Sequence, residues 1–493
     1  MRSRDPQRAD AERPTAPFDL AILGARIVDG MGARPYAADL YVADGRIARI
    51  ARDAPRLSAS EAIDAQGLTL APGFIDVHTH DDVALIATPH MPAKVSQGVT
   101  TVVTGLCGYS AAPFPPGVEP PEEYGILLRG AEDRFETFRA YLDAVAAARP
   151  AVNWLPLVGH STLRLGTMER LDRPAGAAEI AAMCALLREA LRAGAAGLST
   201  GLAYAMAMHA PASELIALSR AMADANGLYV THLRDEADGL LASVEEALEI
   251  GRQAGVGVVF SHHKAIGAAN HGCTAASLAL IDAARETQEV ALDVYPYAFS
   301  STSLTPERAA RGGRVVVTRS AARPDLAGQD LDAIAVMLDC TREDAVRALR
   351  PAGALFHVMD EDDVRRVLRH DRTMIGSDGL PFDELPHPRL WGTFPRVLGR
   401  YVREEGLLTM EEAIHRMTGL PARVFGLADR GRIEVGSVAD LVLFDADLVA
   451  DEASAERPAA PSRGIHDVFV AGRRAGPGTG QRVVSGRAKG NRA

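Results

Sequence analysis

Two histidines stand two residues apart, directly after an apolar run, in the segment Gly73-Phe-Ile-Asp-Val-His78-Thr-His80. In a β-strand, residues i and i+2 point to the same face, so the two imidazoles are expected to project side by side. The preceding residues are apolar, as in a strand that is buried on both faces. Two neutral imidazoles at the end of such a strand make half of a zinc site. The alternative is a pair of core histidines held by hydrogen bonds, so further ligands downstream must decide.

Strand-like segments alternate with helix-like segments along the middle of the chain. The strand candidates are 73–77, 99–104, 154–158, 197–200, 228–231, 257–261, 290–294 and 373–377. Helical patterns such as 177–193 and 212–225 lie between several of them. This alternation indicates an α/β fold with a parallel sheet, and eight such units would close into a (β/α)8 TIM-type barrel. An open doubly wound sheet is the alternative, but no Gly-x-Gly-x-x-Gly motif follows the first strand.

Side chains that can bind a metal or move a proton follow several of these strands. In chain order they are His78 and His80, Cys107, His232, the adjacent His262 and His263, and Asp378. The carboxyl ends of the strands carry the chemistry in barrel enzymes. Neutral imidazoles and a thiolate suit Zn²⁺, which activates water for hydrolysis. Asp378 is placed to take a proton from water and deliver it to a leaving group, although an Asp in such a loop can also cap a helix.

Short strand-like segments also occur near both ends of the chain, at 18–72 and 430–475. Neither makes a convincing β domain alone. Together they are expected to form one small β-sandwich domain beside the metal-dependent barrel, which would span 73–429. The longest gap between strand candidates, about 300–372, holds helical patterns. We therefore expect a helical insertion over the barrel mouth.

The composition fits a globular enzyme, with 493 residues of which 47% are hydrophobic and 24% charged, enough to bury a sizeable core. Residues 1–17 and 476–493 are predicted to be a disordered and a flexible tail. The net charge of −11 argues against a nucleic-acid or anionic-membrane partner. The four cysteines show no disulfide spacing, which favours a cytoplasmic location.

Longer motifs surround the candidate residues. They are Gly98-Val-Thr-Thr-Val-Val, Cys107-Gly-Tyr-Ser, Gly197-Leu-Ser-Thr-Gly-Leu-Ala-Tyr204, Thr231-His-Leu-Arg-Asp-Glu236, Ser261-His-His-Lys264, Asp293-Val-Tyr-Pro-Tyr297, Gly376-Ser-Asp-Gly379 and His387-Pro-Arg389-Leu-Trp-Gly-Thr-Phe. With these motifs the chain resembles the amidohydrolase superfamily and, within it, the N-acyl-D-amino-acid deacylase (D-aminoacylase) family, from about residue 18 to 475. The resemblance implies zinc-dependent hydrolysis of a linear amide that releases a carboxylate and a D-amino acid. The preference for the D configuration rests on the resemblance alone.

The resemblance also implies how the ligands are divided. A tight zinc would be held by Cys107, His232 and His262, and a second, weaker position would be framed by His78 and His80 beside Asp378. At most one of two adjacent strand residues faces the barrel mouth, and the family pattern assigns His262 rather than His263.

Lysine usage gives an independent argument for the cysteine ligand. Many amidohydrolases bridge two metals with a carboxylated lysine, but no position from 95 to 263 is lysine here. Lys94 comes too early to lie at a bridging strand end. A buried structural thiol is the ordinary role of a cytosolic cysteine. The missing lysine and the matching Cys-Gly motif favour Cys107 as a ligand instead.

The free carboxylate of an N-acyl amino acid favours binding by arginine, lysine or hydroxyl groups. Candidates within matching motifs are Tyr204, Arg234, Lys264, Tyr295, Ser301 and Arg389. A structural or solvated role is the alternative for each of them. Leu106 and Met206 stand where the family usually has asparagine and proline, so the pocket wall is expected to differ.

Two other functions remain open from the sequence. A cyclic amidase of the dihydropyrimidinase or hydantoinase type is one, and the missing bridging lysine counts against it. A non-catalytic amidohydrolase-like scaffold is the other, but such a protein should have lost ligands and all six positions are filled. The expected partner is a small-molecule N-acyl amino acid, and self-association is possible.

Overall fold

The computed structural model describes residues 17–487. The predicted tails at 1–16 and 488–493 therefore lie outside the described residues. Among those described, no helix combines the length and the apolar character that crossing a membrane requires.

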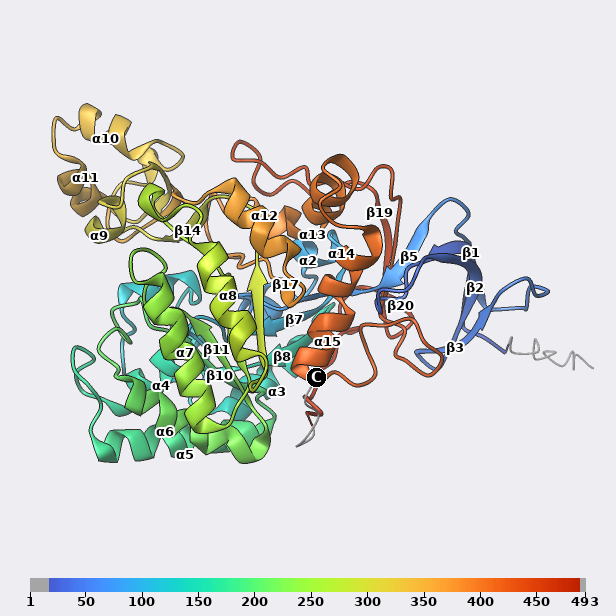
Figure 1. Ribbon diagram of the computed structural model, residues 1–493, viewed down its shortest axis with the longest axis horizontal. Helices are drawn as coiled ribbons and strands as arrows, with labels where there is room; N and C mark the ends of the chain where they lie inside the picture. Colours follow the sequence, from blue (N-terminus) through green and yellow to red (C-terminus); the bar gives the residue numbers. More distant parts are fainter. Residues whose placement is uncertain (1–16, 488–493) are drawn as a thin grey trace, which may run out of the picture.

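A parallel barrel occupies the middle of the molecule (Figure 1). Its strands are β6 (Phe74–Asp76), β7 (Val99–Thr104), β8 (Asn153–Pro156) continued by β9 (Val158–Gly159), β10 (Gly197–Gly201), β11 (Leu228–His232), β12 (Val258–Phe260), β13 (Val290–Val294) and β17 (Thr373–Ile375). They run in the orders β6-β7-β8 and β9-β10-β11-β12-β13-β17. A bridge between Thr79 and Gly379 joins β6 to β17 and closes the barrel. All eight predicted strands are present, which confirms the (β/α)8 prediction.

Side chains along the barrel strands alternate between two buried clusters. In β13, Ala291 packs with Val259 and Met374 inside the barrel. The neighbours Leu292 and Val294 pack outward, in the cluster that holds the helices. Because the side-chain period of a strand is two, Asp293 shares the inward face with Ala291.

Helices cover the outside of the barrel (Figure 1). They are α3 (Phe138–Ala148), α4 (His160–Thr167), α5 (Ala177–Ala193), α6 (Ala212–Met222), α7 (Leu240–Ala254), α8 (Thr274–Ala284), α12 (Glu361–Arg369), α13 (Arg389–Arg396), the π-helix η6 (Val397–Glu404), α14 (Met410–Met417) and α15 (Gly419–Phe425). Shorter turns are α1 (Ala84–Ala87), α2 (Pro92–Val95), η1 (Glu122–Ile126), η2 (Ala131–Asp133), η3 (Ala223–Ala225) and η4 (Ala268–Asn270). Local signals set several ends. For example, Thr409 and Glu412 form a capping box at the start of α14, and Gly194 ends α5 in the left-handed conformation.

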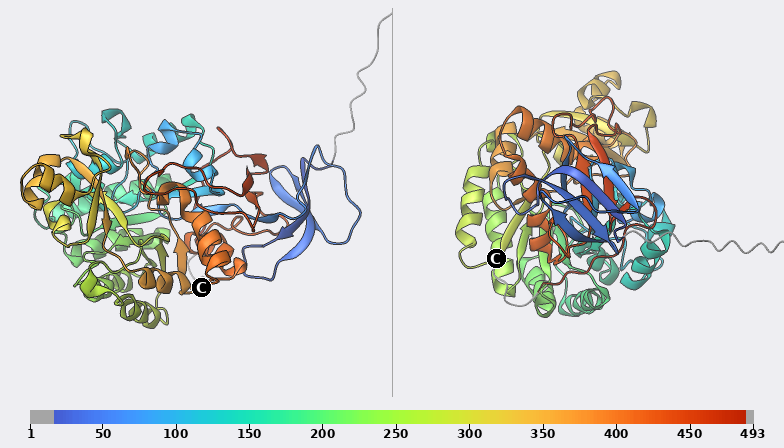
Figure 2. Two further views of the ribbon diagram at one scale, coloured as in Figure 1. Left: turned by 90° about the horizontal axis from the view of Figure 1, so that it is seen from above. Right: turned by 90° about the vertical axis from the view of Figure 1, so that its right-hand side faces the viewer.

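Both ends of the described chain contribute to one eight-stranded sheet, which projects from the barrel in Figure 2. Its strands are β1 (Leu20–Ile27), β2 (Tyr36–Ala43), β3 (Arg46–Ala51), β4 (Glu61–Asp64), β5 (Thr69–Pro72), β18 (Leu441–Phe444), β19 (Ile465–Val470) and β20 (Arg473–Arg474). The antiparallel pairing of β5 with β18 joins the two chain ends. Domain boundaries at 72 and 430 stay a prediction.

The insertion after β13 contains strands as well as helices, whereas the sequence predicts a helical one. Strands β14 (Ser300–Ser303), β15 (Arg314–Ser320) and β16 (Ala352–His357) pair antiparallel in the order β14-β16-β15. Around them lie α9 (Pro306–Ala309), η5 (Pro324–Leu326), α10 (Leu331–Met337) and α11 (Arg342–Leu349). Apolar residues such as Val315, Val317 and Phe356 form a separate core with the helices. Helix α12 falls within the predicted insertion, about 300–372, but it contacts β13, β17 and α8 and so belongs to the barrel.

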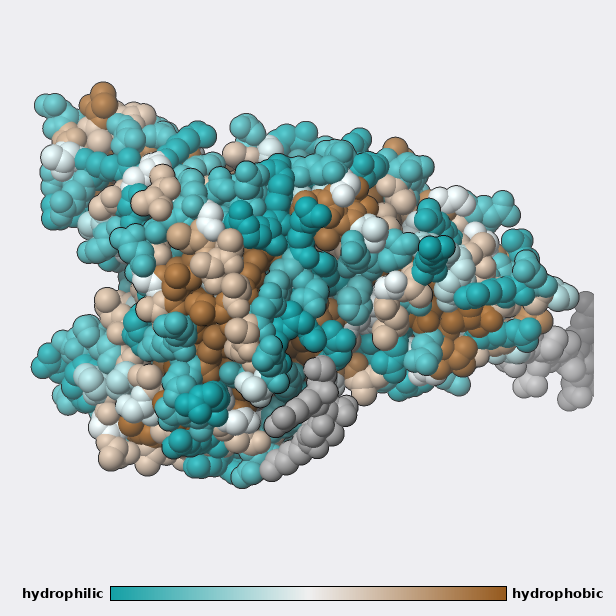
Figure 3. Space-filling view, viewed as in Figure 1, coloured by the Kyte–Doolittle hydropathy of each residue, from teal (hydrophilic) through white to brown (hydrophobic). Residues whose placement is uncertain are grey.

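An apolar patch marks the tip of this insertion in the space-filling view of Figure 3, over α10. Val336 and Met337 are exposed there. Most of the face shown in Figure 3 is hydrophilic.

Residues 476–487 belong to the segment predicted as a flexible tail, but they lie along the barrel. The Gly478 amide donates to the Arg149 carbonyl at 2.6 Å, and the Val483 amide donates to the Trp154 carbonyl at 2.9 Å. Val483 is also buried in the inner barrel cluster. These backbone contacts join residues far apart in sequence, and the local composition does not signal them.

Candidate metal centre

The predicted ligands meet at the carboxyl ends of the barrel strands. His78, His80, Cys107 and Asp378 form one buried group, and Cys107, His232 and His262 form another, with potential ligand atoms within 4.8 Å of one another in each. We call Cys107, His232 and His262 the tight set, and His78 and His80 beside Asp378 the weak set. Cys107 lies between them, since its Sγ is 3.2 Å from His78 Nε2 and 3.4 Å from His262 Nε2.

The donors of both sets suit zinc, which accepts thiolate, imidazole and carboxylate ligands. The buried Nδ1 of His232 has no hydrogen-bond partner among the described residues. A buried polar atom without a partner is costly, so a nitrogen left in this state fits a metal ligand. The residues present therefore fit the metal that the sequence predicts.

Three residues of this centre have left-handed backbones, which residues other than glycine rarely adopt. The φ angles are 52° at Cys107, 34° at His262 and 49° at Asp378. Each residue follows a barrel strand, and the sharp turn brings its side chain into the cluster. Hydrogen bonds hold two of these turns, from the Asp378 amide to the His78 carbonyl at 2.8 Å and from the His262 amide to Asp293 Oδ1 at 2.9 Å. Such strained conformations concentrate at functional sites.

The local charges favour the metal-binding form of Cys107. Burial raises the pKa of its thiol, but the neighbouring His78 and His262 outweigh this effect and hold the pKa well below its usual range. A thiolate is the form that binds metals. Burial lowers the pKa of His232, which favours the neutral imidazole.

Asp378 is also held in its ionised form. Burial raises the pKa of its carboxyl, but Arg389 and then His262 outweigh burial and keep the pKa well below its usual range. Arg389 Nη1 lies 2.8 Å from Asp378 Oδ2. The other oxygen, Oδ1, lies 3.2 Å from His80 Nε2. The carboxylate is thus available to accept a proton at the cluster.

The structure separates the two adjacent histidines that the sequence left in competition. His262 joins the tight set, whereas His263 points to α8 and contacts Ser277 Oγ through its Nε2 at 2.7 Å. Burial lowers the pKa of His263 to about 4, so this imidazole is neutral.

Lys94 is buried beneath the centre and does not reach either set. Its Nζ donates to Asp76 Oδ2 and to Ser377 Oγ, both at 2.8 Å. Asp76 lies in β6 and Ser377 follows β17, so this ammonium group ties together the strands that carry His78 and Asp378.

A cavity of about 520 Å³ opens over the centre. Five of the predicted substrate residues line it, namely Tyr204, Arg234, Lys264, Tyr295 and Ser301. Arg234 is already occupied, because its guanidinium bonds Glu246 at 2.8 and 2.9 Å and the carbonyls of Met208 and Ala210. It therefore braces the loop after β10 and is not free to bind a carboxylate.

Arg389 does not line the cavity. It is 1% exposed and lies behind the wall, with its guanidinium carbon 4.5 Å from the centre of the Tyr295 ring. Its Nη2 donates to the Ser301 carbonyl at 3.2 Å. The structure therefore places Arg389 against Asp378 and not in the substrate space.

Three further residues near the centre have no role in the sequence-based prediction. Glu236 accepts from Lys264 Nζ at 2.7 Å and lies 3.2 Å from His262 Nδ1. Asp293 contacts His78 and His262. Arg308, on α9, lines the cavity. A signal existed for Asp293, because it is a charged residue on the inward face of an otherwise apolar strand, whereas Arg308 lies in the insertion and belongs to none of the motifs.

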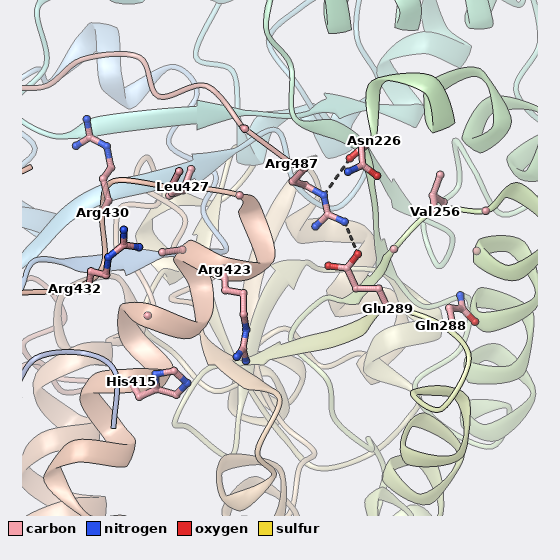
Figure 4. A pocket seen from close by; sticks show the side chains of 18 of the residues that line it. Asn226, Val256, Gln288, Glu289, His415, Arg423, Leu427, Arg430, Arg432 and Arg487 are labelled. Atoms are coloured by element: carbon pink, nitrogen blue, oxygen red, sulfur yellow. Dashed lines mark hydrogen bonds and ion pairs between the residues drawn. The ribbon is translucent and has the colours of Figure 1, made fainter. Parts of the chain in front are cut away.

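A larger cavity, of about 840 Å³, lies at the opposite end of the barrel, where Gly257 and Glu289 precede β12 and β13 (Figure 4). Its charged residues are largely paired with one another or with neighbours. Arg487 bonds Glu289, and Arg432 bonds Glu434 at 2.6 Å. None of the residues that line it belongs to the tight or weak set. Four residues of the candidate metal centre, His80, His232, His262 and Asp378, instead line the smaller cavity.

Known proteins resemble this chain over most of its length. The sequence profile of the amidohydrolase family matches residues 61–475. D-aminoacylase from Alcaligenes xylosoxydans xylosoxydans is 48% identical over 94% of this chain and 95% of its own length. The N-acyl-D-aspartate and N-acyl-D-glutamate deacylases of the same organism are each 47% identical, over 94% and 92% of this chain and 93% of their own lengths.

Solved structures of deacylases also resemble this chain. N-acyl-D-glutamate deacylase from Bordetella bronchiseptica, in complex with zinc and a phosphonate mimic of the tetrahedral intermediate, superposes with a TM-score of 0.92 at 47% identity. The match covers 95% of this chain and all of that one. L-hydantoinase (dihydropyrimidinase) from Arthrobacter aurescens gives a TM-score of 0.60 at 18% identity, over 95% of this chain and all of its own, which shows a shared fold alone.

Proposed function

The chain belongs to the amidohydrolase family, and from this premise we propose that it is a zinc-dependent deacylase of N-acyl-D-amino acids. It hydrolyses the linear amide and releases a carboxylate and a D-amino acid. The observation that carries this proposal is the Cys107 thiolate between two groups of imidazoles, with an ionised Asp378 at the same cluster. Relatives that are named as D-amino-acid deacylases and are 47–48% identical over nearly the whole chain support it.

We assign the tighter zinc to Cys107, His232 and His262, and a second, weaker position to His78 and His80. Zinc bound there would polarise the scissile carbonyl and activate water. Cys107 is the only residue common to the two buried metal-competent groups of the described residues. Loss of its thiolate should therefore affect the metal content more than loss of any one histidine.

Asp378 is the proposed general base and acid. Its Oδ1 faces His80 and His78, at 3.2 and 3.5 Å from their Nε2 atoms. An ionised carboxylate in this position can take a proton from the attacking water. It can then deliver that proton to the amide nitrogen as the C–N bond breaks.

Lys264, Tyr295 and Ser301 are the proposed anchors of the substrate carboxylate, with Tyr204 on the neighbouring wall. The Lys264 ammonium group lies 5.7 Å from the centre of the Tyr295 ring. It donates to Glu236 Oε1 at 2.7 Å and to the His262 carbonyl at 3.0 Å, so a substrate carboxylate would have to compete with these bonds. Ser301 Oγ is buried and has no hydrogen-bond partner among the described residues, so it is free to bind a ligand. A cation and a free hydroxyl that line the same cavity suit a carboxylate.

We also propose a cellular location and partners for the enzyme. A cytoplasmic location is supported by four cysteines that are all free. Self-association stays possible, and the net charge of −11 speaks against a nucleic-acid partner.

A hydrolysis screen tests the proposed function directly. Purified protein is assayed with N-acetyl-D- and N-acetyl-L-amino acids that carry apolar, acidic and basic side chains, and with hydantoin and dihydropyrimidine rings. Release of D-amino acids is expected. Activity confined to L substrates or to rings would overturn the assignment, and less than one equivalent of zinc in every preparation would favour the non-catalytic scaffold.

A further inference from the structure

Asp293 belongs to neither ligand set but contacts one member of each. Its Oδ2 lies 3.2 Å from Nδ1 of His78, in the weak set. Its Oδ1 accepts a hydrogen bond from the backbone amide of His262, in the tight set, at 2.9 Å. Asp293 lies in β13, between the strands that lead to His262 and to Asp378, which explains why one carboxylate reaches both sides.

The carboxylate of Asp293 is buried, and the residue is only 1% exposed. Within residues 17–487, no lysine or arginine forms an ion pair with it, and its one charge-capable partner is His78. A buried carboxylate without a compensating positive charge is costly. Metal ions are often the largest local charges in a site. Cations bound by the adjacent imidazoles would supply the missing compensation.

The contact with His78 sets which nitrogen of that imidazole is free. A carboxylate at Nδ1 favours the tautomer with the proton on Nδ1, so Nε2 keeps its lone pair. That Nε2 lies 3.2 Å from Cys107 Sγ, inside the cluster. Asp293 therefore aims the lone pair of His78 toward the weak position.

The contact with His262 acts on the backbone instead. His262 has a φ of 34°, a conformation that costs energy for any residue with a side chain. The bond from its amide to Asp293 stabilises this turn. This backbone turn brings the His262 imidazole into the tight set.

Gly376 provides the space that the His78–Asp293 contact needs. A Cβ at this position would lie 2.5 Å from the Cβ of His78 and 3.0 Å from Asp293 Oδ1. Any larger residue would displace one of the two partners. This position therefore requires glycine because of the close approach.

From these contacts we propose that Asp293 is a positioning residue shared by both metal positions. The inference rests on the metal ligation proposed above. Glu236 offers a contrast, because its carboxylate lies near His262 and His232 alone among the predicted ligands, at 3.2 and 3.7 Å. Removal of the Asp293 charge should weaken both positions, and removal of the Glu236 charge should weaken only the tight one.

Metal affinity, measured without reference to turnover, tests this proposal. Metal-free wild type, Asp293→Asn and Glu236→Gln are titrated with Zn²⁺ against a chelator, and with Co²⁺, whose absorption reports thiolate ligation. Asp293→Asn is expected to weaken both positions by about 10–100-fold, the usual effect of losing a residue that orients a ligand. Glu236→Gln should leave the weak position unchanged. An effect of Asp293→Asn on one position only, or on neither, overturns the proposal.

Circular dichroism and melting of the metal-free proteins show whether each variant folds. If Asp293→Asn does not fold, Gly376→Ala decides, since it retains the carboxylate but its Cβ would crowd His78 and the Asp293 Oδ1 that accepts from the His262 amide. It should weaken both positions, and an effect on one position only, or on neither, would overturn the proposal. Wild-type protein that binds no zinc would overturn the proposed function as well, whereas zinc-binding wild type with an unaffected Asp293→Asn overturns only this inference.

Discussion

The guanidinium of Arg389 lies 2.8 Å from one oxygen of Asp378, while the other oxygen of that carboxylate faces His80. Both residues are buried. The cation therefore holds a charge that would otherwise be costly to bury, and it leaves the second oxygen free at the metal centre. This pairing separates two roles that the sequence alone does not separate, because it assigns Arg389 to Asp378 instead of to the substrate.

Asp378→Ala should retain zinc and lose turnover. The substitution removes the proposed proton carrier but none of the three tight ligands, so zinc content should stay near that of wild type. A positioned general acid–base group contributes typically 10²–10⁴-fold, and kcat should fall by about that factor. Metal analysis and steady-state kinetics on the same preparation check both halves. Near-normal kcat would remove Asp378 from the mechanism.

Arg389→Met should lower kcat more than it raises KM. It leaves the Asp378 carboxylate buried without its cation, and breaking a buried pair costs about 3–5 kcal/mol. Because Arg389 does not line the cavity, substrate binding should change much less. Kinetics with one N-acetyl-D-amino acid separate the two parameters. A large rise in KM at unchanged kcat would instead indicate direct contact with the substrate.

Cys107→Ser should remove the tight zinc. The thiolate is replaced by a hydroxyl, a much poorer ligand for zinc at neutral pH. Zinc after dialysis against a weak chelator should fall well below one equivalent, and activity should fall with it. Cys184→Ser, at a buried cysteine outside both sets, is the matched control and should retain zinc. Equal zinc retention in both variants would contradict the assignment of Cys107.

The grouping of the candidate ligands was predictable because each follows an apolar strand, and the barrel brings the carboxyl ends of its strands together. His78, His80, Cys107, His232, His262 and Asp378 all carry that local signal. The resemblance favoured His262 over His263, and the turn at φ 34° shows how the structure brings that imidazole into the cluster.

Residues whose roles depend on distant partners could not be placed from the sequence. Arg234 lies in a matching motif, but its guanidinium forms an ion pair with Glu246 on α7. Strands β14, β15 and β16 of the insertion pair over separations that no local periodicity reveals. The contacts of Asp293 depend on the neighbouring strand ends, which only the folded barrel brings together.

Arg308→Met should alter discrimination between substrate side chains. Arg308 lines the cavity, where its guanidinium carbon lies 5.2 Å from the centre of the Tyr204 ring and Nη1 donates to the Ser303 carbonyl at 3.1 Å. Among residues 17–487, no carboxylate lies within ion-pairing distance of Arg308, so it can meet an acidic substrate side chain. A hydrogen bond to a charged group contributes about 1.5–3 kcal/mol, so kcat/KM for N-acetyl-D-glutamate or N-acetyl-D-aspartate should fall by about 10–100-fold.

The loss with N-acetyl-D-leucine should be much smaller. Arg311→Met is the matched control, because Arg311 lines the same cavity but lies 3.8 Å from Asp235. An equal loss for acidic and apolar substrates in Arg308→Met would argue for a structural role.

Glu214→Gln should destabilise the protein above pH 4.5 and progressively less below it. Glu214 is fully buried, and it contacts His160 Nε2 at 2.9 Å and Arg164 Nη1 at 2.6 and 2.8 Å. Burial raises its pKa, but hydrogen bonds from His160 and Arg164 outweigh burial and lower the pKa from 4.5 to about 2. A carboxyl with a lowered pKa contributes stability above its unfolded pKa, and this contribution is lost as the pH falls toward the folded value. The lowered pKa corresponds to a contribution of about 3 kcal/mol at neutral pH.

Denaturant unfolding of metal-free wild type and Glu214→Gln at pH 7, 5, 4 and 3 measures this contribution, and the absence of metal excludes effects of zinc release. The gap between the two proteins should be nearly constant from pH 7 to 5 and shrink toward pH 3. Below about pH 4.5 the Glu214 carboxyl of the unfolded wild type takes up a proton while the folded one stays ionised, and this stabilises the unfolded wild type relative to its folded state. Glu245→Gln, on the exposed face of α7, should change stability by less than about 0.5 kcal/mol at every pH. A gap that persists unchanged at pH 3 would show that the ionised form of Glu214 is not what stabilises this cluster.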